Sequence, residues 1–302
     1  MTGPVIRRPG RLRVKTVRLA SLFLLTLGAS VAVADTQYVQ QVEKWRQEFD
    51  ADIRTGGWLV TIGREKVGEG TWSLGSSPES RIVLPMPSPA HVGTLIRSGE
   101  QIEFEPAQGI EVFIDDRAVT RRTEVSTQQG AGKIKAGQLA LSVRRIANDF
   151  YLNIEDPNNP AIAEFKGSSW FRIDPAYRVV AKFLPYENPQ DVRLALTFES
   201  ASKTFTSTGD VVFQFGGQSM TLKTFILGDE LFLIFQDETN AVETYGGGRF
   251  LYAPLPENGL TTLDFNKAFN PYCAINSYVL CPIVPAVNRL PIGIAAGAQF
   301  RK

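Results

Sequence analysis

The chain has 302 residues, 43% of them hydrophobic and 21% charged, so it is long enough to bury a large core and to form two domains. Its 26 glycines, 18 prolines and 19 phenylalanines, against three methionines, indicate β structure with many turns. The net charge is +1 for the whole chain and −5 without the basic N-terminal segment, which argues against a protein built to hold nucleic acid or an anionic membrane surface.

The N-terminal segment predicts a signal peptide over residues 1–34. An apolar run from Leu19 to Val33 follows the basic residues, and Ala32-Val33-Ala34 fits a small-residue cleavage site. We therefore expect cleavage after Ala34, a periplasmic or secreted protein, and no membrane association afterwards. The alternative is an uncleaved membrane anchor, for which the run is short. The basic residues that precede the run are Arg7, Arg8, Arg11, Arg13, Lys15 and Arg18.

Residues 35–57 predict an amphipathic helix that Gly56-Gly57 ends. We expect Trp45 to be a core anchor rather than a ligand platform. The apolar stripe that predicts this helix consists of Tyr38, Val42, Trp45 and Phe49.

From residue 58 to residue 158 the hydrophobic period becomes two, which is typical of strands. Short alternating runs separated by glycine, proline and serine turns predict a small β-sandwich. The expected strands are residues 58–62, 70–74, 81–84, 93–96, 101–105, 110–114 and 138–144.

This first domain resembles a forkhead-associated domain in its Gly75-Ser76, its Ser88-Pro89-Ala90-His91 and its Ala136-Gly137-Gln138 turn. Ser76 stands where that family has an arginine, and no Asn-Gly pair follows. The resemblance therefore implies a sandwich without phosphothreonine binding.

Residues 159–302 predict a larger antiparallel domain after a turn-rich junction at residues 158–167. Gly216-Gly217 and Gly228-Asp229 are typical hairpin turns. The expected fold class is mainly β, with this domain forming a barrel or a double sheet. Its expected strands are residues 177–183, 192–198, 210–215, 219–226 and 230–236.

Several longer motifs stand out along the chain. They are Trp58-Leu59 with Trp72, Arg144-Arg145, Phe171-Arg172-Ile173-Asp174, Tyr177-Arg178-Val179, Phe235-x-Asp237-x-Thr239 and the run from Glu243 to Leu251, with the segment 263–291. Together these motifs resemble the uncharacterised bacterial family known as domain of unknown function 1684, over the whole mature chain. The resemblance implies no activity, substrate or cofactor. The family's terminal Ala-Gly-Glu-Lys is here Ala296-Gly297-Ala298-Gln299, so any role of that glutamate is lost.

The segment 263–291 concentrates prolines and asparagines and holds both cysteines, Cys273 and Cys281. A compact, irregular element of this kind is where sites are often built. Beside an export signal, two cysteines eight residues apart favour a disulfide. The alternative is a reactive Cys273 thiol near Arg249 or Arg289.

Elimination narrows the chemistry. His91 is the one histidine and lies in the first domain, so a structural role is favoured for it. With so few soft ligands and no calcium-loop spacing, we expect no metal and no cofactor. Gly246-Gly247-Gly248 lacks the residues of a nucleotide-binding loop and predicts a turn.

Three functions stay open. The first is binding of a small polar or anionic ligand in a pocket of the C-terminal domain. The second is a hydrolase with Asp264 or Asp237 as general base and Arg249 or Asn270 on an oxyanion. The third is a structural envelope protein in which Arg249 and Arg289 pair with Asp237 or Asp264. The expected ligand-binding residues are Tyr245, Arg249, Asp264, Asn266, Asn270 and Arg289. The oligomeric state stays undetermined.

Overall fold

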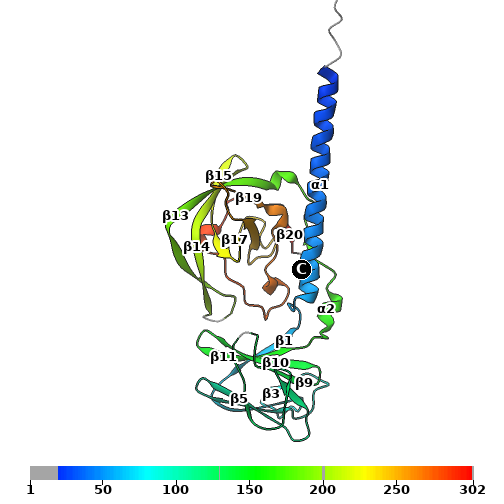
Figure 1. Cartoon of the computed structure of the whole chain (residues 1–302), viewed down its shortest axis with the longest axis vertical. Coiled ribbons are helices and arrows are strands. Elements are labelled where there is room, and N and C mark those ends of the chain that lie inside the picture. Colours follow the sequence, from blue (N-terminus) through cyan, green and yellow to red (C-terminus); the bar gives the residue numbers. More distant parts are fainter. Residues whose placement is uncertain (1–19, 129, 199–200, 301–302) are drawn as a thin grey trace, which may run out of the picture. The chain divides into compact units, whose positions relative to one another are not determined.

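The computed structural model describes residues 20–128, 130–198 and 201–300, and for residues 20–34 only the helical backbone (Figure 1). The chain divides into two compact units, residues 1–41 and 42–302. The expected signal peptide thus lies largely outside the described residues. Among the described helices, none is long and apolar enough to cross a membrane.

The first helix, α1, spans Ala20–Thr55 and ends before Gly57, whose φ of +83° suits only glycine well. Val42 is fully buried, and Trp45 stacks on Phe49 with ring centroids 5.5 Å apart. The predicted end of the helix and the role of Trp45 as an aromatic anchor are confirmed.

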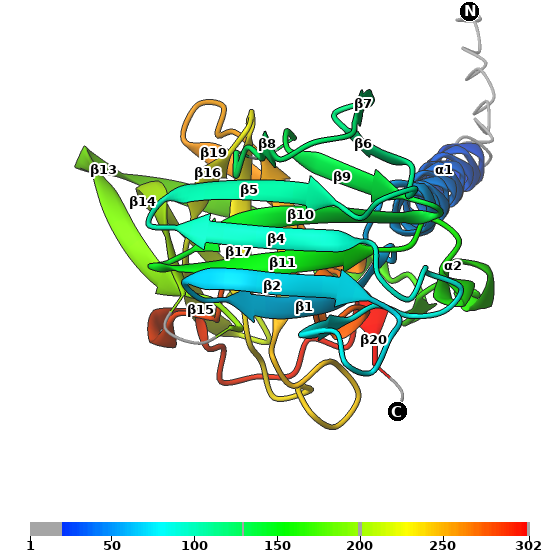
Figure 2. The same cartoon turned by 90° about the horizontal axis from the view of Figure 1, so that it is seen from below.

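The first domain is a sandwich of two sheets, as its alternating pattern predicts (Figure 2). One sheet has the order β3-β2-β4-β5-β8 and the other has the order β1-β11-β10-β9-β6-β7. The strands of the first sheet are β2 (Gly70–Gly75), β3 (Ile82–Val83), β4 (Gly93–Ser98), β5 (Gln101–Pro106) and β8 (Thr123–Glu124). Those of the second are β1 (Thr61–Val67), β6 (Val112–Ile114), β7 (Arg117–Val119), β9 (Lys133–Ala136), β10 (Leu139–Ile146) and β11 (Asp149–Glu155).

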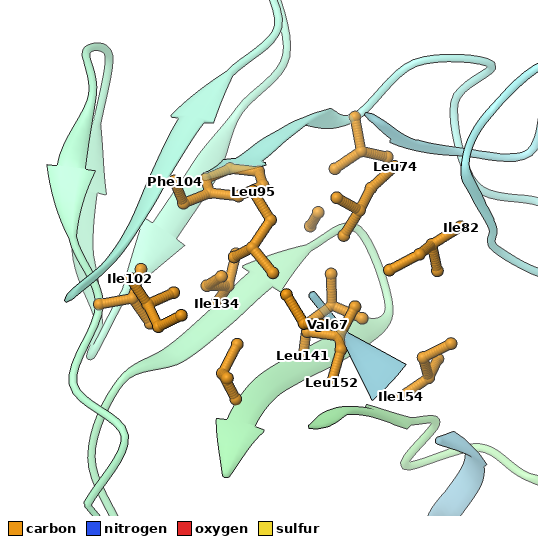
Figure 3. Packing of buried hydrophobic residues seen from close by; sticks show 14 of the residues in the cluster. Val67, Leu74, Ile82, Leu95, Ile102, Phe104, Ile134, Leu141, Leu152 and Ile154 are labelled. Carbon is orange, nitrogen blue, oxygen red and sulfur yellow. The ribbon is translucent and has the colours of Figure 1, made fainter. Parts of the chain in front are cut away.

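Side chains from both sheets fill one core (Figure 3). Leu95 and Phe104 from the five-stranded sheet and Leu141 and Leu152 from the six-stranded sheet are fully buried. Burial of such side chains stabilises the fold by about 1.5–3 kcal/mol each, which explains why the inward positions alternate so regularly.

The second domain contains a four-stranded sheet of order β15-β14-β13-β19, a three-stranded sheet of order β16-β17-β18 and the pair β12-β20. Of the two predicted alternatives, the double sheet is therefore found, and the described strands close no barrel. The strands are β12 (Ser169–Trp170), β13 (Arg178–Ala195), β14 (Ser202–Phe215), β15 (Gln218–Lys223), β16 (Phe225–Leu227), β17 (Glu230–Phe235), β18 (Arg249–Pro254), β19 (Leu260–Asp264) and β20 (Ala298–Gln299). A short helix, α2 (Pro160–Glu164), precedes them.

Strand β13 corrects one prediction. The sequence indicates two strands on either side of Pro185, whereas the structure has one strand of 18 residues. Its pairing with β14 shifts register between Pro185 and Gln190, and such an irregularity lets a proline sit in a continuous strand.

Candidate functional site

The C-terminal segment that the sequence singles out is irregular backbone held in place by buried asparagines. It contains the 3₁₀ turns η2 (Phe265–Lys267), η3 (Tyr272–Ala274) and η4 (Ala286–Asn288). Asn288 is fully buried and makes three hydrogen bonds to main-chain groups of Lys223 and Ile234. An amide side chain supplies both a donor and an acceptor, which irregular backbone needs when it cannot join a sheet.

The side chain of Asn266, like that of Asn288, bonds to main-chain groups. Its side chain accepts from the N–H of Asp174 at 3.0 Å and donates to the C=O of Asp174 at 2.8 Å, and its own carbonyl accepts from Arg46 at 2.9 Å. Asn270 donates to the carbonyl of Gln299 at 3.0 Å. These contacts tie the segment to α1 and to strand β20.

Arg249 lies in the interior, with no exposed surface. Its Nη2 donates to Asp237 Oδ2 at 2.5 Å and to the carbonyl of Ile294 at 2.8 Å, and its Nη1 donates to the carbonyl of Ala296. Burial lowers the pKa of Arg249, and the Asp237 carboxylate opposes that effect. The guanidinium therefore fastens residues 294–296 to strand β18.

Both carboxylate oxygens of Asp237 accept hydrogen bonds within the protein. Its Oδ1 accepts from the N–H of Thr239 at 2.8 Å, from the Thr239 hydroxyl at 2.5 Å and from the N–H of Ile294 at 3.3 Å, while Oδ2 faces Arg249. A carboxylate with these partners and a side chain without exposed surface cannot reach a substrate proton.

The six expected ligand-binding residues do not converge on one cavity. Tyr245 borders a surface hollow of about 590 Å³ formed by residues 241–246 with Gln299 and Phe300. Asp264 borders a separate hollow of about 250 Å³ and caps η2 by accepting from the N–H of Asn266 at 3.2 Å. The residue types are visible in the sequence but their distances are not. Four of the six (Arg249, Asp264, Asn266 and Asn270) are buried, while Arg289 is exposed.

A different cavity, of about 650 Å³, is lined mostly by aromatic and aliphatic side chains. Its walls come from the end of β10, the start of β14, strands β16–β18 and the C-terminal segment. The apolar lining consists of Trp58, Ile146, Ala147, Leu196, Ala201, Phe205, Leu227, Phe232, Phe250, Tyr252, Tyr272, Val279, Leu280 and Pro282, with Arg145, Ser202, Lys203 and Cys281 as its polar members. A concave, apolar lining with a few polar groups is typical of small-molecule sites.

The walls of this aromatic cavity are held by ring contacts. Phe232 meets Phe250 edge to face at 5.0 Å and lies 5.2 Å from Tyr252. Tyr272 stacks face to face on Trp58, with ring centroids 3.7 Å apart. Burial, and then the negative charge of Asp52, raises the pKa of Tyr272, so this phenol stays neutral. The rings are therefore pre-positioned, which lowers the entropic cost of binding.

Two cations stand among the lining residues. Lys203 places its ammonium 5.3 Å from the centroid of Phe205. Arg145 pairs with Glu100 at 2.7 Å through side chains that are 49% and 71% exposed. An exposed ion pair contributes little free energy, so Arg145 can turn towards another anion at small cost.

The two cysteines are free thiols in contact with each other. The N–H of Cys273 donates to Cys281 Sγ at 3.2 Å, and the N–H of Cys281 donates to the hydroxyl of Thr197 at 3.2 Å. Neither Arg249 nor Arg289 is the group that adjusts the pKa of Cys273; hydrogen bonds from Cys281, Thr197 and Tyr245 do so.

In the part of the chain that is described, no group of three or more histidine, cysteine or acidic side chains is placed to hold a metal ion. His91 is exposed, beside the sandwich strand β4.

The fold and the cavity define a mainly β protein with a pre-formed apolar pocket, which is lined by residues of the second domain together with Trp58 and residues 145–147 of the first. Residues 163–299 match the family described as protein of unknown function (DUF1684), and the C-terminal part of the chain thus belongs to that family. A solved structure of an uncharacterized protein from gene locus rrnAC0354 of Haloarcula marismortui is 32% identical, over 46% of this chain and 78% of that one, with a TM-score of 0.40. No curated protein matches the chain.

Proposed function

We propose that the protein binds an amphiphilic anion, a molecule with an apolar chain and one acidic head group, in the aromatic cavity. The observation that carries this proposal is the combination of an apolar cavity of about 650 Å³ with Arg145 and Lys203 among its lining residues. A volume of this size lies within the range of small-molecule sites. The anionic ligand expected from the sequence is kept, but its binding site is the aromatic cavity rather than the six residues expected from the sequence.

The apolar part of the ligand would lie against Phe205, Phe232 and Tyr252. Burial of apolar surface there supplies about 25 cal/mol per Å². The head group would face Lys203, whose ammonium stands at the ring of Phe205, and Arg145. Cationic side chains beside an apolar wall favour a carboxylate, sulfonate or phosphate over a neutral or cationic head.

The basic and apolar N-terminal segment supports a place for this function outside the cytoplasm, after cleavage following Ala34. We infer, too, that the whole mature chain shares the architecture of the family that its C-terminal part matches. For the first domain, a forkhead-associated-like sandwich without phosphothreonine binding is supported by Ser76, which donates its hydroxyl to the carbonyl of Ser88 at 2.7 Å.

The test is a thermal-shift and calorimetric titration of the purified mature chain with dodecanoate and, as the matched cation, dodecyltrimethylammonium. At a dodecanoate concentration a hundredfold above Kd, binding stabilises the folded state by about 2.7 kcal/mol, which raises Tm by about 5–10 °C. The cation should bind at least tenfold more weakly. If both compounds bound equally well, the preference for an anionic head group would be refuted. If neither bound, the proposal of a binding site in the aromatic cavity would be refuted.

Two variants locate the site. Leu227, 38% exposed on the cavity wall, becomes Leu227→Trp, which fills the cavity and should abolish the shift; its control is Leu255→Trp at a leucine that is 44% exposed elsewhere. Lys203→Glu should weaken dodecanoate at least tenfold, whereas Lys182→Glu, an exposed lysine on β13, should not. Equal losses in variant and control would place binding elsewhere.

Among the described residues, no observation favours the hydrolase alternative. Asp237 is enclosed by Arg249, Thr239 and Ile294, and the aromatic cavity contains no carboxylate among its lining residues.

A further inference from the structure

We propose that Cys273 and Cys281 form a thiol–disulfide exchange site, in which Cys273 is the attacking thiol and Cys281 the resolving thiol. The juxtaposition of a partly exposed thiol and a buried thiol, both held by hydroxyl and main-chain groups, carries the inference. The inference does not rest on ligand binding in the aromatic cavity, although Cys281 also borders that cavity.

The loop between the cysteines holds them together without a bond. Asn276 Nδ2 donates to the carbonyls of Trp58 at 2.9 Å and Thr61 at 3.0 Å, which anchors the loop at its centre. The N–H of Val279 donates to the carbonyl of Asn276 at 3.0 Å and closes a turn. Thr197 brackets Cys281, because its hydroxyl accepts from the N–H of Cys281 and its own N–H donates to the carbonyl of Cys281 at 2.9 Å. The loop therefore loses little conformational entropy when a disulfide forms between Cys273 and Cys281.

The surroundings distinguish the two thiols. The Cys281 thiol donates to Cys273, and this bond, with those from Thr197 and Tyr245, lowers the pKa of Cys273 although burial opposes it. The same contact, together with burial, raises the pKa of Cys281. Cys281 is 3% exposed, whereas Cys273 is half-buried. Since the thiolate is the nucleophile, the more accessible and more acidic Cys273 reacts first.

The co-reactant is a small-molecule disulfide. The Cys273 thiolate attacks one of its sulfurs, the external S–S bond breaks, and one thiolate leaves. Cys281, after losing its proton, attacks the mixed disulfide at the Cys273 sulfur and expels the second thiolate. The protein loses two electrons and two protons, and the external disulfide is reduced to two thiols. Two equivalents of a small thiol reverse the sequence, reduce the internal disulfide and are oxidised to the external disulfide.

The test uses the reduced mature chain and oxidised glutathione, with quenching by N-ethylmaleimide and intact-mass measurement. The wild type should form the internal disulfide without accumulating a mixed disulfide. Cys281→Ser should accumulate one glutathionyl group, on Cys273. Cys273→Ser should react at least about tenfold more slowly than Cys281→Ser. Equal rates of the two serine variants, or a mixed disulfide that persists in the wild type, would overturn the assignment.

Two further measurements exclude a purely structural bridge. Reduced glutathione should reopen the internal disulfide in the folded protein; a bond that resists it would contradict exchange. Tyr245→Phe keeps both thiols and removes one hydrogen bond to Cys273, so it should shift the pH profile of alkylation upwards and slow the reaction at neutral pH several-fold. An unchanged pH profile of alkylation in this variant would refute the role of the Tyr245 hydroxyl. If the two cysteines also became equally reactive on unfolding in urea, their difference in reactivity in the folded protein would come from exposure alone.

Discussion

Replacing Arg249 by methionine should destabilise the protein by about 3–5 kcal/mol, the usual cost of leaving a buried carboxylate without its partner. The magnitude follows from the site. The Arg249 and Asp237 side chains are both 0% exposed and 2.5 Å apart, and the same guanidinium satisfies the carbonyls of Ile294 and Ala296. Methionine fills much of the volume but leaves these acceptors buried and unpaired.

Urea unfolding followed by tryptophan fluorescence measures this loss. With a slope of about 3 kcal/mol per M, the midpoint should fall by about 1–1.7 M. Arg289→Met, at an exposed arginine in the same segment, is the matched control and should change the free energy of unfolding by no more than about 0.5 kcal/mol. Asp237→Asn completes a double-mutant cycle, in which we expect a coupling energy above about 1 kcal/mol. A loss below about 1 kcal/mol for Arg249→Met, or strict additivity with Asp237→Asn, would refute the interpretation of Arg249 as the fastener of the C-terminal segment.

Gly297→Ala should lower the free energy of unfolding by more than about 2 kcal/mol in the same assay, because φ is +78° and an added Cβ would meet the carbonyls of Ala268 and Phe265. The control is Gly216→Ala, at φ +57° with open space around it, which should lower that free energy only by the backbone strain of about 1 kcal/mol. Equal losses would show that the turn at Gly297 yields to the methyl group. Glu230 gives a pH dependence: burial, then Asp229, raises the pKa of this carboxyl against the effect of Lys267. An acid whose pKa rises on folding stabilises the fold when protonated, so stability falls as pH rises through the folded pKa. Glu230→Gln should therefore raise the urea midpoint above wild type at about pH 8 and not at about pH 3.5, below both pKa values; a difference that is the same at both pH values would contradict this cause.

Much of the fold is predictable from local patterns. The alternation of Val211, Phe213 and Phe215 predicts β14, and Gly228-Asp229 predicts the turn between β16 and β17. These features depend on neighbours in sequence, so the residues themselves reveal them. The joined strand β13 is not predictable in this way, because whether Pro185 ends a strand depends on the register of its partner β14.

The candidate site was less predictable, and the reason is physical. Arg249, Asn266 and Asp237 have the residue types of a binding site, yet each is occupied by main-chain groups or by its neighbours. A side chain's chemistry shows what it can bond, but not whether the fold has already supplied a partner. The aromatic cavity depends instead on rings that come from distant elements, such as Trp58 and Phe205. The sequence signals for these rings are the high phenylalanine content and the presence of Trp58 in a motif, and neither shows that the rings meet around a cavity.

The contacts of Asn276 have a consequence for the order in which the protein acquires its structure. The sandwich core is composed entirely of residues between 62 and 154, so it can close while later parts of the chain are still being synthesised. The join between that sandwich and the second domain forms later, because the carbonyls of Trp58 and Thr61 accept hydrogen bonds from the side-chain amide of Asn276. During translation or translocation, the molecule passes through an intermediate with a finished first domain whose attachment is among the last elements to form. A chain released before residue 276 would therefore have a folded sandwich but no partner for the carbonyls of Trp58 and Thr61. We expect the backbone near residue 58 to be exposed to proteolysis in such a chain.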